Sequence, residues 1–384
     1  MSNPITISII GGGIGGLAAA LALIKRGFAV QVYERAQELR PIGAGLTLAP
    51  NGLNALYAIQ PGLVQALKKA GREVRSLTMK RSTGETILSR PADLTPQFGQ
   101  PMLNIQWPRL HLTLAAALPP DTIFLSHRCT GIEQRDGGVT ALFETGKAVK
   151  SDLLVGADGI NSVIRQALIG DGPPAYAGRM SWRALIKFPH PDLTPNASTG
   201  FTSPDGKDVM LFDMGEGHTC WSAGALAPEA PVCDQPADVK NRVLETYSGW
   251  ADLVDAIIKA TPAQDIVERT ICDRPPVRTW TKGRVTLLGD AAHPVVPALG
   301  QGANMAFEDA YELAAFLSTA PNIDAGLRAY EESRIPRTEA ISVRSAKQGF
   351  SSYKPDSDET LAEISEGEFQ AWLYGYQPSA IRFQ

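Results

Sequence analysis

Five glycines close to the N-terminus are the residues whose spacing points most clearly to a chemical task. They lie in Gly11-Gly12-Gly13-Ile14-Gly15-Gly16, which satisfies the pattern G-x-G-x-x-G. In such a loop the first glycine makes a tight turn, the second lets the backbone approach a pyrophosphate, and the third lets a helix pack closely on a strand. The free N–H groups at the start of that helix bind phosphate oxygens. We therefore expect this loop to hold a dinucleotide.

The flanking sequence predicts the elements that this loop needs. Residues 5–10 form a β-branched run typical of a central parallel strand, and apolar residues at spacings of three and four predict a helix over 14–24. Gly27 would end the helix, and residues 28–33 predict a second strand. Glu34 follows it, close to the spacing of roughly 20 residues at which an acid reaches a ribose hydroxyl. FAD and NAD both fit this unit, whereas the charge of Glu34 disfavours NADP.

Two aspartates further along the chain also follow predicted strands. Asp158 comes after the apolar run 153–155 and precedes a helix entered through Asn161 or Ser162, and Asp290 comes after the run 285–288. Ligands of open α/β sheets bind beyond the carboxyl ends of the strands. Each aspartate is therefore a candidate ligand-binding residue, and the alternative in each case is an ordinary helix cap or capped turn.

Four segments, in this order and spacing, resemble the single-component FAD-dependent aromatic monooxygenases. That family includes p-hydroxybenzoate hydroxylase, salicylate hydroxylase and 6-hydroxynicotinate monooxygenase. The segments are the glycine loop with Glu34 and Arg35, residues 40–52, residues 152–165 and residues 289–304. The resemblance extends from residue 5 to about residue 335 and is loose between about 170 and 270.

The resemblance implies an α/β fold, α+β overall, of the p-hydroxybenzoate hydroxylase type. A Rossmann-like FAD-binding domain would be formed by residues 1–75, 100–170 and 271–335. An antiparallel-sheet substrate domain would be formed by residues 76–99 and 171–270. A C-terminal helical region, 336–384, contains an aromatic stretch at 369–376 that resembles tails covering one side of the pocket in some relatives.

The resemblance also assigns cofactor contacts. In the family, the aspartate at the position of Asp290 holds a ribityl hydroxyl of FAD, and the fingerprint around Asp158 touches FAD and serves NAD(P)H. N–H groups around Gln301, at a helix start, would stabilise negative charge on a reduced isoalloxazine. The residues expected at the cofactor are Gly11, Gly13, Gly15, Gly16, Glu34, Arg35, Gly45, Arg109, Asp158, Asp290, Pro297, Gly300, Gly302, Ala303 and Asn304.

Two positions depart from the family pattern. Trp107 stands where relatives usually place an arginine, and Arg109 follows two residues later. Arg109 either reaches the FAD phosphates from a different turn or is a solvated residue near a helix start. Thr47 lies in the segment that runs beside the substrate, where relatives that activate a phenol can carry histidine. Because threonine cannot act as a base near pH 7, base catalysis through this position is in doubt.

The middle of the chain predicts the substrate domain. Residues 179–188 alternate as a half-buried strand would, and residues 209–214 and 218–223 flank Gly215-Glu216-Gly217 as a hairpin. The resemblance implies that this sheet roofs the flavin. Candidate pocket walls, each with core packing as the alternative, are Thr47, Trp182, Phe201, Met210, Phe212 and Trp221.

Arg183 needs a partner because it is a charge inside a predicted strand. It would bind a substrate carboxylate, a nicotinamide phosphate or an acid of its own domain. No histidine offers a convincing base, since His293 is expected to be structural. The candidate catalytic residues are Thr47, Arg183, His218 and Pro297, with the flavin supplying most of the chemistry.

We expect a monooxygenase for a small aromatic or N-heteroaromatic substrate. NADH or NADPH would reduce FAD, O2 would add at the flavin C4a, and the hydroperoxide would attack the substrate in a dry pocket. Only one complete G-x-G-x-x-G occurs, so the reductant would visit transiently. The alternatives are an isoprenoid epoxidase, a flavin-dependent alkene reductase, and a non-catalytic binding protein of the same fold. The intact glycines together with Asp290 disfavour the last.

Composition argues against several other functional classes of protein. The 384 residues include 36 Lys and Arg and 40 Asp and Glu, without a basic stripe, so nucleic-acid binding is not expected. Four scattered cysteines show neither metal nor redox-pair spacing, which argues for a reducing compartment and against a metal site or a flavin disulfide reductase. Glycines interrupt the apolar run 5–24, so we expect no signal peptide or membrane span. The expected location is the cytoplasm, as a monomer or homodimer.

Overall fold

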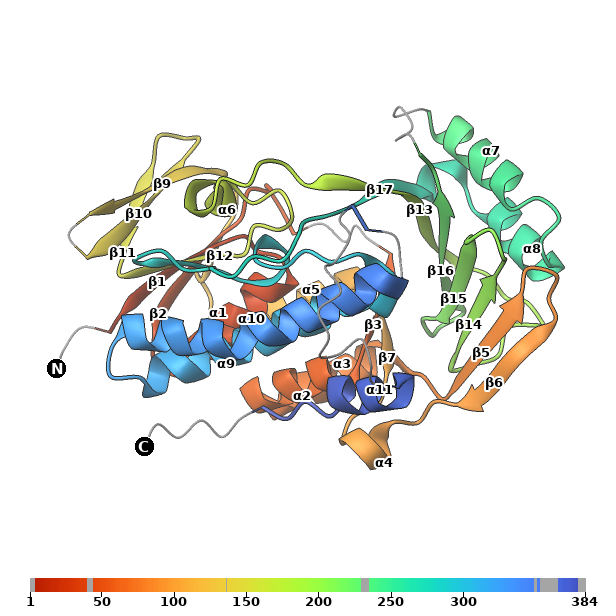
Figure 1. Ribbon diagram of the computed structural model, residues 1–384, viewed down its shortest axis with the longest axis horizontal. Coiled ribbons are helices and arrows are strands. Elements are labelled where there is room, and N and C mark those ends of the chain that lie inside the picture. Colours follow the sequence, from red (N-terminus) through yellow and green to blue (C-terminus); the bar gives the residue numbers. More distant parts are fainter. Residues whose placement is uncertain are drawn as a thin grey trace.

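Two sheets, one parallel and one largely antiparallel, form the frame of the computed structural model (Figure 1). Residues 4–39, 44–135, 137–228, 235–348, 351–352 and 365–378 are described. Residues 40–43 of the family-like segment 40–52, Cys233, and residues 349–350, 353–364 and 379–384 of the expected C-terminal region lie outside this part of the chain.

The parallel sheet contains the strands that the glycine loop requires. Its order is β18 (Val285–Leu287), β12 (Leu153–Gly156), β1 (Thr6–Ile10), β2 (Ala29–Tyr33) and β8 (Ile123–Phe124). Every neighbouring pair is parallel. The three strands β1, β12 and β18 end in the glycine loop, in Asp158 and in Asp290, so the sheet brings all three to one edge. The Rossmann-like prediction is confirmed.

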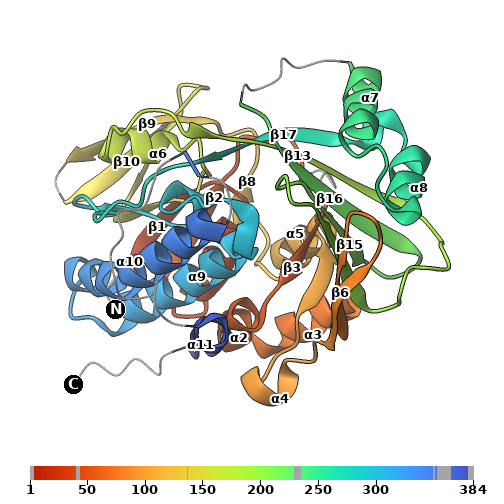
Figure 2. The same ribbon diagram turned by 45° about the vertical axis from the view of Figure 1, so that its right-hand side comes forward.

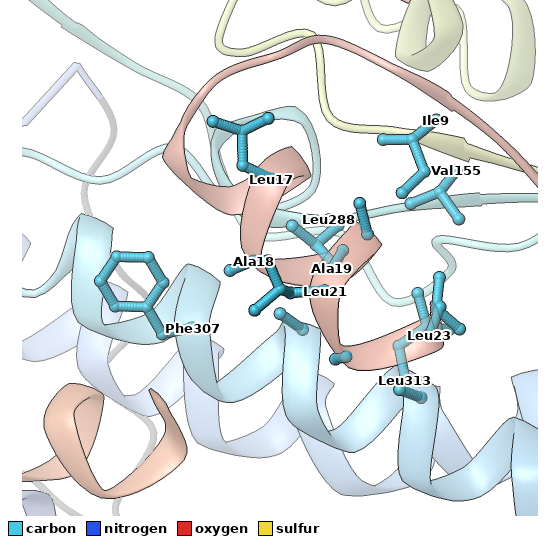
Figure 3. Close-up of a cluster of buried hydrophobic side chains, with 14 of the residues drawn as sticks. Ile9, Leu17, Ala18, Ala19, Leu21, Leu23, Val155, Leu288, Phe307 and Leu313 are labelled. Carbon is cyan, nitrogen blue, oxygen red and sulfur yellow. The ribbon is translucent and has the colours of Figure 1, made fainter. Parts of the chain in front are cut away.

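Helices cover this sheet and fix the direction of the glycine loop. The main helices are α1 (Ile14–Ile24), α9 (Gly302–Thr319) and α10 (Ile323–Gln348), with α2 (Pro50–Ile59), α3 (Pro61–Ala70), α5 (Trp107–Ala116) and α6 (Val163–Leu168). Alanines in α1 let it pack closely on α9, and Ala18 and Leu21 face the helix that carries Phe307 and Leu313 (Figure 3). Helix α10 crosses the expected boundary between residues 335 and 336 without a break.

A further antiparallel sheet lies beside the parallel one. It consists of β9 (Cys129–Arg135), β10 (Gly138–Phe143) and β11 (Ala148–Ser151). At the other end of the molecule, α11 (Glu366–Tyr374) packs through Phe369 and Leu373 on Met305 of α9 and Ile341 of α10. No helix in the described ranges is both long and apolar enough to cross a membrane.

The large sheet lies beside the FAD-type domain, as the two views show (Figures 1 and 2). Its order is β17 (Val267–Asp273), β13 (Ala175–Lys187), β16 (His218–Leu226), β15 (Asp208–Asp213), β14 (Ala197–Thr202), β5 (Ser76–Arg81) and β6 (Thr86–Pro91). Five of the neighbouring pairs are antiparallel, including the predicted hairpin β15–β16, whereas β14 and β5 run parallel. The sheet is therefore mixed, because β5 enters it from the other domain instead of through a hairpin with β14.

The two faces of the large sheet have different neighbours. One face, which we call the outer face, packs on α7 (Pro236–Thr246) and α8 (Asp252–Ala260) and forms a separate apolar core. The opposite, inner face meets the FAD-type domain through a small sheet of β3 (Gly45–Leu48), β7 (Leu103–Gln106) and β4 (Arg72–Glu73). This contact is direct, since the Gly45 N–H donates to Cys220 Sγ at 3.2 Å.

Candidate functional site

The glycine loop has the shape that the sequence predicts. Gly11 has a φ of 110°, and a Cβ on it would lie 2.3 Å from the Ala157 carbonyl oxygen. A Cβ on Gly16 would lie 2.0 Å from the Gly11 carbonyl oxygen, so both positions exclude any side chain. A Cβ on Gly13 would meet no atom within 4 Å. The loop is thus closed against the protein at its first and last glycines and open at Gly13, where a pyrophosphate would approach.

Glu34 holds the same loop from the end of β2. Its Oε2 accepts from the Gly12 N–H and its Oε1 from the Ala36 N–H, both at 2.8 Å. A carboxylate offers about four lone-pair sites, so two bonds leave Glu34 able to accept from further hydroxyls. Arg35, the next residue, is exposed.

A histidine that was not predicted from the sequence contacts the backbone of the glycine loop. His111 of α5 is buried, and its Nε2 lies 2.6 Å from the Gly12 carbonyl oxygen. Because a carbonyl oxygen only accepts, Nε2 carries the proton in this contact. The Trp107 ring stacks on His111 with centroids 4.5 Å apart. Trp107 therefore occupies the family's arginine position with a different task, which is to orient His111.

Asp158 is engaged with the helix that follows it. Its Oδ1 accepts from the Ser162 hydroxyl at 2.5 Å and its Oδ2 from the Val163 N–H at 2.7 Å. Burial raises the pKa of Asp158, against the opposing effect of the Ser162 hydrogen bond. The geometry is that of a capped turn at the start of α6, and it fixes this turn beside the Ala157 carbonyl that closes on Gly11.

Asp290 has the opposite character, because it accepts no hydrogen bond from the described residues. It is exposed and lies near the start of α9, where a Cβ on Gly302 would be 3.7 Å from its Oδ1. Surrounding protein nevertheless desolvates the carboxylate and raises its pKa, with His293 opposing and Asp309 adding to the effect. The Asp290 carboxylate is thus accessible and has no hydrogen-bond partner in the described part of the chain. It is free to accept from a bound hydroxyl.

Buried charges hold the loop that carries Asp290, residues 289–301. Asp309 of α9 accepts from the Gly289 N–H at 3.0 Å, from Arg334 Nε at 2.8 Å and from His293 Nε2 at 2.5 Å. Burial alone would raise the pKa of Asp309, but His293 and Arg334 outweigh it and lower that pKa to about 2. The Asp309 carboxylate is therefore charged and ties α9 to both the loop and α10.

Two further contacts fix the remainder of this loop. Arg165, fully buried, donates to the carbonyl oxygens of Ala291 at 3.1 Å and Ala292 at 2.7 Å, and pairs with Asp171 at 2.7 Å. At the other end, Asn51 Nδ2 donates to Gln301 Oε1 at 2.9 Å. Neither role could be predicted from sequence, since a single polar residue inside a helix carries no spacing signal of its own.

Asn304, expected at the cofactor, is bonded to protein instead. Its Oδ1 accepts from the Ala49 N–H at 2.9 Å and its Nδ2 donates to the Gly300 carbonyl at 3.0 Å. It is fully buried and joins the start of α9 to the end of β3. The exposed edge of the same region is formed by Pro297 and Gly300, while Gly302 and Ala303 are half-buried.

Arg109 binds protein groups of both domains. Its Nη2 lies 2.6 Å from Glu216 Oε2, on the tip of the β15–β16 hairpin, and its Nη1 donates to the Ala70 carbonyl at 3.2 Å. Arg109 thus bridges the two domains, and a contact with FAD stays a prediction. Gly45 is the other expected residue at this junction, where a Cβ would lie 2.0 Å from Met214 Cε.

Strand register divides the expected pocket walls into two groups. Trp182, Phe201 and Trp221 lie on the outer face, in the core shared with α7 and α8. They differ from the expectation of pocket walls and match the core-packing alternative. Along β15, Met210 and Phe212 alternate with Val209 and Leu211, which belong to the outer core. Met210 and Phe212 therefore lie on the inner face.

His218 does not join the inner-face residues in a common cavity. It lines a cavity of about 590 Å³ beneath the loop 188–196, together with Thr199 and Leu211 of the outer face. Its Nδ1 is buried and has no hydrogen-bond partner within the described chain. Neither Thr47 nor Arg183 lines this cavity.

Arg183 projects from β13 on the inner face, opposite Ser222. No acid pairs with it among the residues that the structure describes, and its nearest polar contact is Ser181 Oγ, 3.4 Å from its Nε. Desolvation lowers the pKa of Arg183, with the Cys220 thiol opposing and Arg269 adding to the effect. Of the alternatives left open by the sequence, a salt bridge within the domain is therefore not observed in this part of the chain.

The family is settled by a match along most of the chain. The model of a family described as FAD binding domain matches residues 5–345. The chain belongs to this family. It is accordingly an FAD-dependent monooxygenase, as the sequence predicts.

Individual relatives agree with this assignment. The chain is 36% identical over 341 residues to aurachin C monooxygenase/isomerase of Stigmatella aurantiaca, covering 88% of this chain and 87% of the relative. It is 34% identical over 389 residues to 3-amino-4-hydroxybenzoate 2-monooxygenase PtnB3 of Streptomyces platensis, and the match covers 98% of this chain and 97% of the relative. Klebsiella pneumoniae HpxO, solved with FAD and uric acid, superposes with a TM-score of 0.84 at 29% identity. The superposition covers 90% of this chain and 87% of the HpxO chain.

The residues present fit FAD. The space at Gly13 is open, the Asp290 carboxylate is accessible without a partner in the described chain, and Gln106 Nε2 is buried without one. Gln106 lies directly across the strand pair from Gly45. A bound flavin that passes from the glycine loop toward the inner face would supply acceptors and donors to these groups.

Replacing the free carboxylate tests this fit. We expect Asp290→Ala to weaken FAD binding by about ten- to a hundredfold, because one charge-assisted hydrogen bond is lost. The measurement is fluorescence titration of apoprotein with FAD. Asp192→Ala, in the exposed loop 188–196, is the matched control and should bind FAD as the wild type does. Equal affinities for both variants would show that Asp290 does not bind the cofactor.

The lowered pKa of Asp309 predicts an acid-sensitive loop. A carboxyl group whose pKa is depressed on folding stabilises the protein above its unfolded pKa, near 4, and loses that contribution as the pH falls toward about 2. We expect Asp309→Asn to lower the free energy of unfolding by about 3 kcal/mol at pH 7, since Arg334 loses a buried partner. In urea titrations the variant should also lose less stability than the wild type between pH 4 and pH 2.5. Asp265→Asn, at an exposed position, should follow the wild type at every pH.

Proposed function

We propose that the protein is an NAD(P)H-consuming monooxygenase that hydroxylates a small aromatic or N-heteroaromatic substrate between the inner face and the FAD-binding domain. The observation that carries the proposal is Arg183, a half-buried arginine on the inner face without an acid partner in the described chain. A partly desolvated guanidinium without an acid partner favours an anion, and a ligand carboxylate or phosphate would provide it. The carboxylate in the name of the relative PtnB3, an aminohydroxybenzoate monooxygenase, supports this direction.

The cofactor would lie along the edge where the parallel strands end. Gly11, Gly13, Gly15, Gly16 and the start of α1 would hold the pyrophosphate, Glu34 and Arg35 the adenosine end, and Asp290 a ribityl hydroxyl. N–H groups of Gly302 and Ala303, at the start of α9, would face the flavin ring beside Pro297, Gly300 and Gly45. Asp158 and Asn304 would act by fixing the turns on which these contacts depend.

Bound FAD would accept a hydride from NADH or NADPH and, with O2, supply the C4a-hydroperoxide whose terminal oxygen is transferred. The protein's own contribution would be to orient the substrate and exclude water. Only one G-x-G-x-x-G occurs, so the reductant would bind transiently over the FAD domain. The inner face supports these tasks with Met210 and Phe212 as apolar walls and Arg183 as the anchoring charge.

No side chain of the inner face would act as a general base. Thr47 cannot ionise near neutral pH, and His218 lines a different cavity. Substrates that are already electron-rich would therefore be favoured, because they need no deprotonation by the protein. Hydroxylated and aminated arenes belong to this class.

The decisive experiment follows labelled oxygen into product. Holoenzyme with NADH or NADPH is incubated under ¹⁸O2 with hydroxylated benzoates and nicotinates, including 3-amino-4-hydroxybenzoate. We expect one class to stimulate NAD(P)H oxidation and to gain a single ¹⁸O atom on the ring. Label in an isoprenoid epoxide, or a saturated alkene without label, would instead establish one of the alternative reactions.

A substitution at Arg183 tests the anchoring charge. For a carboxylated arene, Arg183→Met should raise KM about tenfold or more with a smaller change in kcat, because a charged hydrogen bond is lost from binding. The matched control is Arg328→Met, at an exposed position of α10 in the FAD-binding domain. An unchanged KM for Arg183→Met would leave the carboxylate without its proposed partner.

A further inference from the structure

Thr47 and Asn104 form a directed hydrogen bond where the two domains meet. They lie directly opposite each other on β3 and β7, on the face of the small sheet that meets the inner face. The neighbours of Asn104 on β7, Leu103 and Ile105, point the other way into the core of the FAD-binding domain. The Thr47 hydroxyl lies 2.7 Å from Asn104 Oδ1, and Asn104 is fully buried.

The surroundings of Asn104 decide which way its amide points. Its Nδ2 lies 3.3 Å from the Asp213 carbonyl oxygen and 3.3 Å from Ser198 Oγ, both on the large sheet. A carbonyl oxygen can only accept, so the amide nitrogen must face Asp213 and the amide oxygen must face Thr47. The amide therefore spans the two domains with a fixed polarity.

This polarity determines the state of the Thr47 hydroxyl. A hydroxyl has one proton and two lone pairs, and the amide oxygen of Asn104 requires that proton. Thr47 is half-buried and lies on the face of the small sheet that meets the inner face, so a substrate bound between the two sheets would meet this hydroxyl. Because its proton is used by Asn104, the Thr47 hydroxyl has only lone pairs left for a ligand. Thr47 is thus an acceptor, fixed by Asn104, and not a group that can turn and donate.

We propose that Asn104 is a positioning residue that makes Thr47 an obligatory acceptor for the substrate. The substrate is then an arene or heteroarene that presents a donor, such as a phenol O–H, an aniline N–H or a ring N–H, in its protonated form. This rests on the proposed function and narrows it. A phenolate would place its lone pairs against those of Thr47, and an alkene would leave the buried acceptor unsatisfied, so both are disfavoured.

Ligand pairs that differ only in the donor test this inference. Holoenzyme is titrated with 4-hydroxybenzoate, 6-hydroxynicotinate and 3-amino-4-hydroxybenzoate and with their O-methyl ethers, following the flavin absorbance. We expect the hydroxylated member of at least one pair to bind about tenfold tighter than its ether, which is the effect of one unmade hydrogen bond. Its binding should weaken as the pH rises through the pKa of the ligand's own phenol.

Two substitutions at Thr47 separate hydrogen bonding from shape. Thr47→Val keeps the volume and removes the acceptor, so the preference for the hydroxylated member should disappear. Thr47→Ser keeps the hydroxyl and should keep the preference. A Thr47→Val holoenzyme that still prefers the hydroxylated ligand about tenfold would overturn the inference.

Asn104→Ala tests the positioning role by itself. Without the amide oxygen the Thr47 hydroxyl becomes free to donate, so ethers and phenolates should gain affinity and the pH dependence of binding should flatten. A variant that loses affinity equally for all ligands at all pH values would contradict the role, because general loosening predicts that result. If Asn104→Ala does not fold, the comparison of Thr47→Val with Thr47→Ser still decides.

The outcomes distinguish this inference from the proposed function. Wild-type holoenzyme that binds ethers as tightly as phenols would refute the obligatory acceptor while leaving an arene hydroxylase in place. Holoenzyme whose flavin spectrum and NAD(P)H oxidation respond to no arene of the panel would refute the aromatic function, and the inference would fall with it.

Discussion

The pairing of fully buried charges behind the loop 289–301 is the interaction on which the site depends. Asp309 holds the N–H of Gly289, the ring of His293 and the guanidinium of Arg334. Glu308, its neighbour, binds Arg334 and Arg337 and accepts from Asn51. Removing any single partner would leave a charge in a medium that solvates it poorly, so the whole set is retained or lost together. The network thereby restrains the loop that carries the Asp290 carboxylate.

Rigidity here comes from tertiary contacts that local sequence does not specify. Arg334 lies on α10 and is separated by 25 residues from its partner Asp309. Arg337 also donates to the Leu373 carbonyl at 2.9 Å and lies over the Trp372 ring at 4.5 Å. Helix α11, expected to cover one side of the pocket, therefore also anchors α10 at the buried charges. Its effect on the cofactor would be transmitted through these charges.

Features that depend on residues close together in the chain could be predicted from the sequence, and features that depend on distant partners could not. The glycine loop and Glu34 were predictable, because tight turns and close helix packing impose residue types at fixed spacings. The burial of Trp182 and Trp221 in the outer core was not, since alternation along a strand defines two faces without saying which one meets the cofactor. Arg109 was ambiguous for a related reason, because its partner Glu216 lies 107 positions away on another domain.

In the proposed function, polar groups between the two domains would select the substrate. Arg183 supplies a positive charge without a partner in the described chain, and Asn104 fixes the polarity of Thr47 from the opposite side. A ligand that satisfies both must combine an anionic group with a neutral donor at a distance set by two rigid sheets. The same FAD scaffold with apolar residues at these positions would favour an apolar alkene. A buried polar group left without a hydrogen bond costs more free energy than a satisfied one contributes. The choice between an arene and an isoprenoid substrate would thus depend on whether the groups facing the flavin need hydrogen-bond partners.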